Sequence, residues 1–364
     1  MAELSKEQIE SVLADYTLPL FNTDPISGKM VKAIEIKDNL VRIELELGIP
    51  IDKIRHDIAE ELKEKIKLHS PTDDVLVNIH SKIIPHAVQK NVSALKGVKN
   101  VIAVGSGKGG VGKSTVAVNL ALALSEEGAK VGMMDADIYG PSLPTMLGCG
   151  GKAVSHDGKS LEPMEAHGIQ FISMGNMLDS DDAPVIWRGP MAVSALQQLL
   201  NDTNWNDVDY LIIDLPPGTG DIQLTLCQNI PVTGAVIVTT PQDISLIDAS
   251  KALKMFEKVD VTVLGIIENM STHICSKCGH EEAIFGKGGA EAMSERYGVP
   301  LLGQIPLAIE VREGMDKGDP VVIADPESPI TRAFIQIARH VAVEIAKKPK
   351  NFSAKMPKIV VENK

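Results

Sequence analysis

Residues 107–115 read Gly107-Lys108-Gly109-Gly110-Val111-Gly112-Lys113-Ser114-Thr115. This run satisfies the pattern Gly-x-x-x-x-Gly-Lys-Ser/Thr, in which glycines let successive backbone N–H groups converge on phosphate oxygens at the start of a helix. Lys113 supplies positive charge to the β and γ phosphates, and the hydroxyl of Ser114 is placed to ligate Mg²⁺. An apolar run precedes the motif and a helical pattern follows it, which argues against a glycine-rich turn without a ligand. The sequence therefore predicts a site for a nucleoside triphosphate and Mg²⁺.

Short apolar runs alternate with helical patterns from residue 101 onward, as in repeated strand–helix units around a parallel sheet. The predicted strands cover residues 101–104, 131–134, 169–174, 210–213, 235–238, 261–267 and 301–305. The predicted helices cover residues 113–127, 193–200, 222–228, 246–258 and 290–297, and a last helix has one apolar face over residues 330–345. We expect an α/β fold, a P-loop NTPase with a mostly parallel central sheet flanked by helices and preceded by a small α+β domain.

That small domain is predicted over residues 1–90. Ser5 and Gln8 form a capping-box pattern at the start of a helix. Residues 30–36, 40–47 and 75–79 are strand candidates, with Lys37-Asp38-Asn39 as a turn, and residues 54–66 carry an apolar face at helical spacing. The predicted organisation is this domain over 1–90, a linker over 91–99, the α/β domain over 100–347 and a solvated tail over 348–364.

Composition excludes several classes of protein. Hydrophobic residues make up 44% and charged residues 23% of the 364 residues, which are values of a folded chain. A formal net charge of −12 and an aromatic content of 3% argue against a nucleic-acid-binding surface. No run approaches the roughly 20 apolar residues of a membrane span, and the first ten residues lack the apolar core of a signal peptide. Because four cysteines do not make a disulfide scaffold, we expect a cytoplasmic protein without a nucleic-acid or membrane partner.

Two acidic segments end predicted strands, where an α/β sheet places its ligands. The first is Asp135-Ala136-Asp137, and the second is Asp214-Leu215-Pro216-Pro217-Gly218. Apolar residues ending in Asp214 form a Walker B pattern, and Gly218 is placed to donate its N–H to the γ phosphate. An aspartate alone often caps the next helix. Three motifs in this order, however, supply the phosphate loop, the carboxylate near Mg²⁺ and the water-orienting group that a nucleotide hydrolase needs.

Cys275 and Cys278 stand two residues apart in His273-Ile274-Cys275-Ser276-Lys277-Cys278-Gly279-His280. This turn directs two thiolates at one point, but one pair cannot fill four tetrahedral positions. His273 and His280 crowd into the same short loop, which argues against them as the missing ligands. A two-fold dimer would supply four thiolates, and these suit Zn²⁺ and an iron–sulfur cluster equally well. An unused surface turn and half of a zinc site are the alternatives.

The full set of motifs resembles the Mrp/ApbC family of iron–sulfur cluster carrier proteins over roughly residues 100–347. The blocks that carry the resemblance are the phosphate loop with its extra lysine, Asp135-Ala136-Asp137-Ile138-Tyr139-Gly140-Pro141-Ser142, Trp187-Arg188-Gly189-Pro190-Met191, the Asp-Leu-Pro-Pro-Gly-Thr-Gly-Asp run from Asp214, and Glu268-Asn269-Met270-Ser271 ahead of the cysteines. Lys108 is similar to the extra lysine of the dimeric ATPases that include septum-site, plasmid-partition and nitrogenase iron proteins. The resemblance implies a homodimer that slowly hydrolyses ATP, holds a [4Fe–4S] cluster between its chains and transfers it to apo-proteins.

The resemblance also implies roles for single residues. Lys108 reaches the nucleotide of the partner chain, Asp137 orients the attacking water, and Asp135 belongs to the metal shell. Asn269 contacts the adenine, although asparagine is also a common turn residue. The implied nucleotide-binding set is Gly107, Lys108, Gly109, Gly110, Val111, Gly112, Lys113, Ser114, Thr115, Asp135, Asp214, Gly218 and Asn269.

Cluster ligation is implied for Cys275 and Cys278 alone. Cys149 and Cys227 match no ligand of the family, and Cys227 is expected to be a buried thiol in a helix. Residues 1–90 resemble the small iron–sulfur assembly domain often fused ahead of this ATPase, with Asp24-Pro25 matching. Because residues 1–100 contain no cysteine, a role in docking or recognition is expected there. The implied partners are a second copy of the chain, apo iron–sulfur proteins and cluster-assembly scaffolds.

Three other functions compete with this hypothesis. A partition or division-site ATPase would bind DNA or membrane, but Pro349 and Pro357 interrupt the region after the last helix, and the cysteine pair is unexplained. A P-loop kinase or ligase would need an acceptor site, for which the sequence shows no signature. A dithiol redox protein usually places its Cys-x-x-Cys at the start of a helix, whereas this pair precedes Gly279 in a loop.

Overall fold

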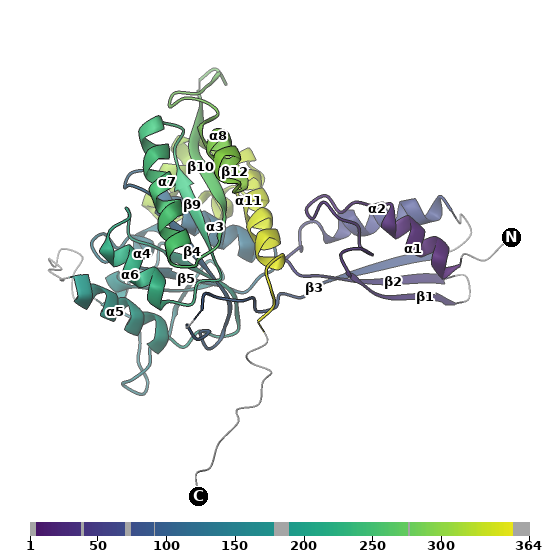
Figure 1. Cartoon of the computed structure of the whole chain (residues 1–364), viewed down its shortest axis with the longest axis horizontal. Helices are drawn as coiled ribbons and strands as arrows, with labels where there is room; N and C mark the ends of the chain where they lie inside the picture. The colour runs from purple at the N-terminus through teal and green to yellow at the C-terminus, as the bar shows by residue number, and fades with distance from the viewer. Residues whose placement is uncertain are drawn as a thin grey trace, which may run out of the picture.

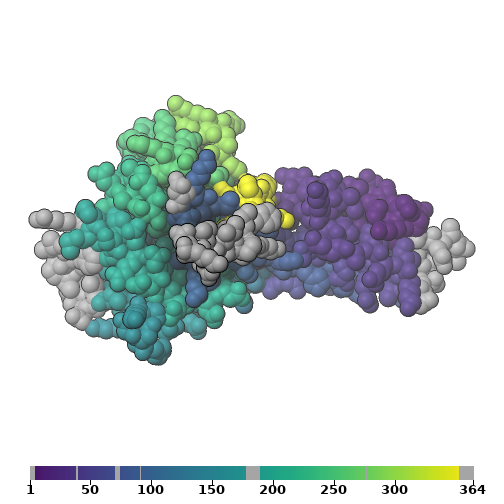
Figure 2. Space-filling model, turned by 60° about the horizontal axis from the view of Figure 1, so that its bottom comes forward, coloured from purple at the N-terminus to yellow at the C-terminus, as the bar shows by residue number. Residues whose placement is uncertain are grey.

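The computed structural model describes residues 5–37, 40–69, 74–90, 92–177, 189–275 and 277–351. Figure 1 shows a small N-terminal domain that projects from a larger α/β domain, and Figure 2 shows the same two lobes from another side. Several predicted features lie partly outside the described residues: the centre of the turn at residues 38–39, Trp187-Arg188 of the block ending at Met191, Ser276 of the cysteine turn, and residues 352–364 of the tail.

The larger domain is built on a nine-stranded sheet within the described residues, in the order β11-β10-β9-β4-β8-β5-β7-β6, with β12 also paired to β10. The pairs among its inner strands are parallel, which confirms the predicted mostly parallel sheet, and only the short edge strands β6 and β11 run antiparallel. The strands are β4 (Val98–Gly105), β5 (Val131–Asp135), β6 (Met164–Ala166), β7 (Ile169–Ser173), β8 (Val208–Asp214), β9 (Gly234–Thr239), β10 (Val263–Ile274), β11 (Glu281–Glu282) and β12 (Leu301–Leu307).

Helices cover both faces of this sheet (Figure 1). Helices α3 (Lys113–Glu126), α10 (Val321–Ala324) and α11 (Pro329–Ala346) pack together on one face. Four helices lie on the other face: α5 (Gly189–Asp202), α6 (Asp221–Asn229), α7 (Asp243–Lys258) and α8 (Gly289–Tyr297). Short helices α4 (Leu143–Met146), η1 (Met174–Met177) and α9 (Ile309–Lys317) fill the connections. Since both faces are covered, the inner strands are apolar on both sides, as a parallel sheet requires.

The N-terminal domain has the order α1 (Lys6–Ala14), β1 (Val31–Lys37), β2 (Leu40–Leu47), α2 (Arg55–Lys67) and β3 (Asp74–Ser81). Ser5 and Gln8 form the predicted capping box at the start of α1. Strand β2 pairs antiparallel with β1 and parallel with β3. Val41, Ile43, Leu45 and Leu47 alternate along β2 and are completely buried, as the period of two predicts, whereas Leu40 at the start of the strand is only partly buried.

The structure corrects the predicted ends of the α/β domain. Strand β4 begins at Val98, inside the predicted linker, because Val98 already pairs with Val208 of β8. Residues 349–351 are not a free extension: the N–H of Ala87 donates to the carbonyl of Pro349 at 2.8 Å, and that of Asn351 to the carbonyl of Pro85 at 3.0 Å. The segment before β4 and the segment after α11 therefore run side by side.

The two domains meet at the C-terminal end of α3. The N–H of Asp52 donates to the carbonyl of Glu127 at 3.0 Å, and Lys53 Nζ lies 2.8 Å from the carboxylate of Glu126. Glu127 is itself buried and accepts two hydrogen bonds from Arg339 of α11. The apolar cores of the N-terminal domain and of the α3 face form one contiguous cluster. Among the described residues, no helix combines the length and apolar character needed to cross a bilayer.

Candidate functional site: a phosphate loop and a cysteine turn

The predicted phosphate loop joins β4 to α3. Gly110 and Gly112 adopt φ of 81° and 77°, left-handed conformations that favour glycine, and Gly112 caps the first turn of α3. A Cβ on Gly112 would also lie 2.3 Å from Nδ2 of Asn269. These turns leave the loop's N–H groups at the positive end of a 14-residue helix, which is an anion-binding arrangement.

Gly107 is required for a different reason, the close approach of α7. A Cβ there would lie 2.1 Å from the carbonyl carbon of Asp248, whereas a Cβ on Gly109 would approach no atom closer than Pro217 Cβ at 3.9 Å. We expect Gly107→Ala to lower the free energy of unfolding by about 3 kcal/mol or more, because backbone must move. In a domain of this size, that corresponds to roughly 6–12 °C in the thermal midpoint followed by circular dichroism. Gly109→Ala is the matched control, and an equal loss in both variants would contradict the packing argument.

Lys113 forms a buried ion pair with Asp214 of the Walker B strand. Its Nζ lies 2.5 Å from Asp214 Oδ1 and 3.2 Å from Ser114 Oγ, and both charged side chains are almost completely buried. Asp214 Oδ2 is buried without a hydrogen-bond partner. A buried carboxylate oxygen beside a serine hydroxyl is a suitable donor set for Mg²⁺, which prefers oxygen ligands. The structure thus brings Lys113, Ser114 and Asp214 together.

The Asp135-Ala136-Asp137 segment lies beside this pair, since Asp135 aligns with Asp214 across strands β5 and β8. The carboxylate of Asp135 accepts from the N–H groups of Asp137, Ser142 and Leu143 at 3.0, 2.9 and 3.2 Å, and from Ser173 Oγ at 3.1 Å. These bonds fix the loop that carries Asp137. Burial, followed by the charge of Asp214, raises the pKa of Asp135 to about 6.

Asp137 is only partly buried, and its pKa is also raised. Burial is the largest cause, the Lys113 ammonium opposes it, and Asp214 adds to it. A partly exposed carboxylate close enough to feel the charge of Lys113 is in a suitable position to contact a water.

Two other predicted nucleotide contacts have protein partners in this structure. Asn269 Nδ2 donates to the carbonyl of Val111 at 2.9 Å, so this side chain fastens β10 to the phosphate loop. Gly218, with φ of 97°, donates its N–H to the carbonyl of Ser106 at 3.1 Å. Lys108 is half-exposed beside the loop, and large apolar side chains of Tyr139, Ile244 and Ile247 are 57–70% exposed.

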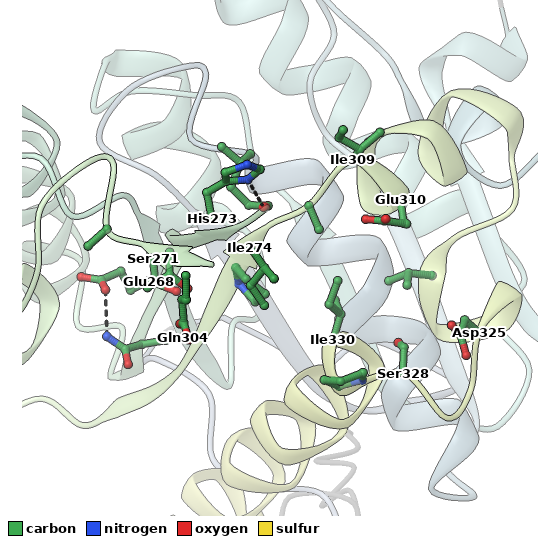
Figure 3. A pocket seen from close by; sticks show the side chains of 18 of the residues that line it. Glu268, Ser271, His273, Ile274, Gln304, Ile309, Glu310, Asp325, Ser328 and Ile330 are labelled. Atoms are coloured by element: carbon green, nitrogen blue, oxygen red, sulfur yellow. Dashed lines mark hydrogen bonds between the residues drawn. The ribbon is translucent and has the colours of Figure 1, made fainter. Parts of the chain in front are cut away.

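A cavity of about 990 Å³, not foreseen from the sequence, opens at the carboxyl ends of β10 and β12. Figure 3 shows Ile309 and Ile330 among the side chains that line it, and Glu268 hydrogen-bonded to Gln304. Glu268 immediately precedes the residue that contacts the phosphate loop. The position fits the rule that ligands of α/β sheets bind beyond the carboxyl ends of the strands.

Cys275 and Cys278 occupy the turn of an antiparallel hairpin formed by β10 and β11. The N–H of Cys275 donates to the carbonyl of His280 at 2.9 Å, and the N–H of Gly279 returns to the carbonyl of Cys275 at 2.8 Å. Cys278 is exposed and Cys275 partly so. Backbone N–H groups of Lys277 and Cys278, then the Cys278 thiol, lower the pKa of Cys275, which favours the thiolate that metals bind.

The described residues do not add a third metal ligand to the two cysteines. His273 Nδ1 lies 3.2 Å from the carbonyl of Leu307, and the described part of the chain holds no group of three or more His, Cys, Asp or Glu suited to a metal ion. Cys227 is buried in α6, as predicted, and its pKa is raised to about 12 by that burial. Cys149 is partly exposed, with its thiol 3.7 Å from the carbonyl of Glu165.

Residues 97–342 match the sequence profile of a protein family that is described as NUBPL iron-transfer P-loop NTPases. The chain belongs to this family. A second profile, of iron–sulfur cluster assembly proteins, matches residues 6–79. The iron–sulfur cluster carrier protein of Haemophilus influenzae is 51% identical over 350 residues, which span 93% of this chain and 92% of that protein. The protein of the same name from Escherichia coli K12 is 50% identical over 353 residues, 94% of this chain and 93% of that protein. The resemblance to Mrp/ApbC carriers is confirmed.

Solved structures of P-loop NTPases place the fold in the same group. A nucleotide-binding protein of Archaeoglobus fulgidus, in complex with ADP, is 36% identical with a TM-score of 0.56, covering 65% of this chain and 93% of that one. The cell division ATPase MinD of Pyrococcus furiosus is 25% identical with a TM-score of 0.51, covering 66% of this chain and 98% of that one. Both matches agree with the predicted P-loop NTPase fold.

Proposed function

We propose that this chain binds an iron–sulfur cluster of the [4Fe–4S] type and transfers it to apo-proteins, as a homodimer that binds and slowly hydrolyses ATP. The observation that carries the proposal is the cysteine turn, which presents two thiols, with no third ligand among the described residues, just after the strand that also contacts the phosphate loop. Asn269 and Cys275 are six residues apart, which is at most about 20 Å along the chain, and β10 is irregular between them, where Met270 has a φ of 57°. The proposed nucleotide site and the cysteine turn are thus joined by one short segment of the chain.

The nucleotide side of the mechanism follows from the charges around Lys113. In the structure described here its ammonium rests on Asp214; with ATP bound, it would neutralise the β and γ phosphates instead. The N–H groups of residues 107–115 would hold the phosphates, and Ser114 and Asp214 would hold Mg²⁺, which would supply positive charge against the phosphates. Asp137 would orient the attacking water, while Asp135 holds the loop of Asp137 in place next to the metal.

The adenine is proposed to enter the cavity beyond β10 and β12. Its apolar side chains, Ile309 and Ile330, suit the faces of a purine, and its polar groups suit the ring edge (Figure 3). Asn269 would remain the link between the base cavity and the phosphate loop.

A second copy of the chain would complete both sites. Lys108 is half-exposed next to the phosphates and free to reach a nucleotide held by the partner chain. Exposed apolar residues such as Ile244 and Ile247 on α7 are typical of a surface that another protein covers. Two cysteine turns would give the four thiolates that a [4Fe–4S] cluster takes. A division-site-like ATPase that binds membrane or DNA would leave the cysteine hairpin without a purpose.

Transfer is tested with chain that has been reconstituted anaerobically and freed of unbound iron. Mixed with an apo-enzyme that requires a [4Fe–4S] cluster, it should restore that enzyme's activity, while its own visible absorption falls in proportion. The same experiment with an iron chelator present separates direct transfer from release into solution. Activation that the chelator abolishes would contradict a carrier. We expect cluster-assembly scaffolds to be the proteins that load the cluster onto this chain.

A further inference from the structure

We propose that Gln89, in the segment that joins the two domains, is a positioning residue that couples the nucleotide site to the N-terminal domain through helix α6. This inference rests on the proposed function, because it needs nucleotide at the phosphate loop. It assigns a role to a residue that none of the sequence motifs contains.

The side chain of Gln89 caps the C-terminal end of α6. It is 9% exposed, and its Nε2 donates to the carbonyls of Cys227 at 2.8 Å and Ile230 at 2.6 Å. The carbonyl of Cys227 is in the last turn of α6, where carbonyls have no intrahelical partner, and α6 has no basic residue in that turn. Ile230 is the first residue after the helix, and its carbonyl also accepts from the N–H of Val232 at 2.9 Å. Both amide hydrogens are therefore used, and the opposite amide orientation would set oxygen against two carbonyls.

The other end of α6 begins at the nucleotide site. The helix starts at Asp221, directly after the segment that runs from Asp214 through Gly218. In this structure the N–H of Gly218 donates to the carbonyl of Ser106, the residue immediately before the phosphate loop. Donation of that N–H to a γ phosphate would break this bond. A nine-residue helix spans only about 13 Å and moves as a unit, so a shift at its start displaces the two carbonyls at its end.

Residues 86–89 are fixed by hydrogen bonds to other parts of the chain, so a displacement of α6 must change the contacts of this segment. His86 is buried, and its N–H and Nδ1 both lie 3.1 Å from Asn100 Oδ1 of β4. Ala87 is bonded to Pro349, as described above. The segment thus either follows α6 or loses the two bonds of Gln89. Since β3 ends at Ser81, only five residues before His86, the response reaches the N-terminal domain.

Hydrogen–deuterium exchange of the full chain tests the coupling, with Mg²⁺ and either ADP or a non-hydrolysable ATP analogue. In wild type we expect the amides of residues 84–90 to differ in exchange rate between the two nucleotides by about threefold or more, together with residues 214–230. Gln89→Met keeps the side-chain length but has no donor. In this variant the difference should persist at residues 214–220 and disappear at 84–90. Gln228→Ala, an exposed amide on the same helix, is the control and should behave as wild type.

The outcomes separate this inference from the proposed function. No nucleotide-dependent protection of residues 107–115 would contradict the nucleotide site, and the coupling would fall with it. Protection there, with no difference at residues 84–90 in wild type, would overturn the coupling alone. So would an unchanged difference at 84–90 in Gln89→Met. The wild-type comparison holds even where the variant folds poorly.

Discussion

Replacing both Cys275 and Cys278 by alanine is expected to abolish iron–sulfur reconstitution. Wild-type chain, treated anaerobically with iron and sulfide, should develop a broad visible absorption band and retain about two iron and two sulfide per chain, half of a shared [4Fe–4S] cluster. The double variant should retain neither. The expected effect is all-or-none, because no other described residues near the turn form a metal-binding group.

The chain offers two matched controls for this experiment. Cys227→Ala removes a buried thiol, and Cys149→Ala removes one that lies outside the hairpin; both variants should load as wild type does. Metal analysis distinguishes the outcomes. Iron retained by the double variant would place the cluster elsewhere, and zinc alone in wild type would assign the turn to a structural metal. The double replacement of Cys275 and Cys278 should leave folding intact, since Cys278 is exposed and Cys275 partly so.

Lys113→Ala is expected to lose nucleotide binding by at least about 100-fold, because a single charged hydrogen bond contributes about 1.5–3 kcal/mol and this ammonium would contact two phosphates. Hydrolysis should fall with it. Loss of the ion pair also leaves Asp214 buried without a counter-charge, which is destabilising by about 3–5 kcal/mol. Equilibrium binding of a fluorescent ATP analogue and phosphate release measure the two effects, while cluster loading should stay normal.

Lys108→Ala is the informative comparison. Lys108 forms no ion pair with Asp214 in this structure, so binding should change by less than about threefold, while turnover drops by about 100-fold or more if it acts across the dimer. An equal loss of nucleotide binding in Lys108→Ala and Lys113→Ala would contradict a role of Lys108 in the partner's site.

Cluster transfer is a separate test of Lys113→Ala. Transfer at the wild-type rate would contradict coupling between ATP and the cluster.

Much of the fold was predictable from local pattern. The phosphate loop located the start of α3 at Lys113, and apolar runs located the inner strands to within a few residues apart from the end of β10, because strands buried on both faces carry no polar interruption. The edges were missed. Strands β6 and β11 are two or three residues long and pair antiparallel, so they have no periodicity of their own, and β10 extends to Ile274 because its outer half pairs with β12.

The candidate site likewise has a part that was predictable from local sequence and a part that was not. Residues on one continuous motif, such as Lys113 and Ser114, were identified with their neighbours, and the structure brings Asp135 and Asp214 to them. The contacts of Asn269 were not predictable, because its partner Val111 is 158 residues away in sequence. The cavity beyond β10 and β12 was missed because it is assembled from strand ends and from α9 and α11, whose relative placement no sequence spacing reveals. Gln89 escaped notice for the same reason.

The pairing of the interdomain segment with the chain after α11 bears on how this protein can be dissected. A fragment that starts at residue 97, where the P-loop family match begins, would contain every strand of the large sheet. It would nevertheless leave Asn100 without His86, α6 without its distant cap, and residues 349–351 without the backbone they bond to. A cut near residue 82 keeps all three. A truncation therefore tests the small domain alone only when residues 82–96, which join the two domains, stay attached to the larger domain.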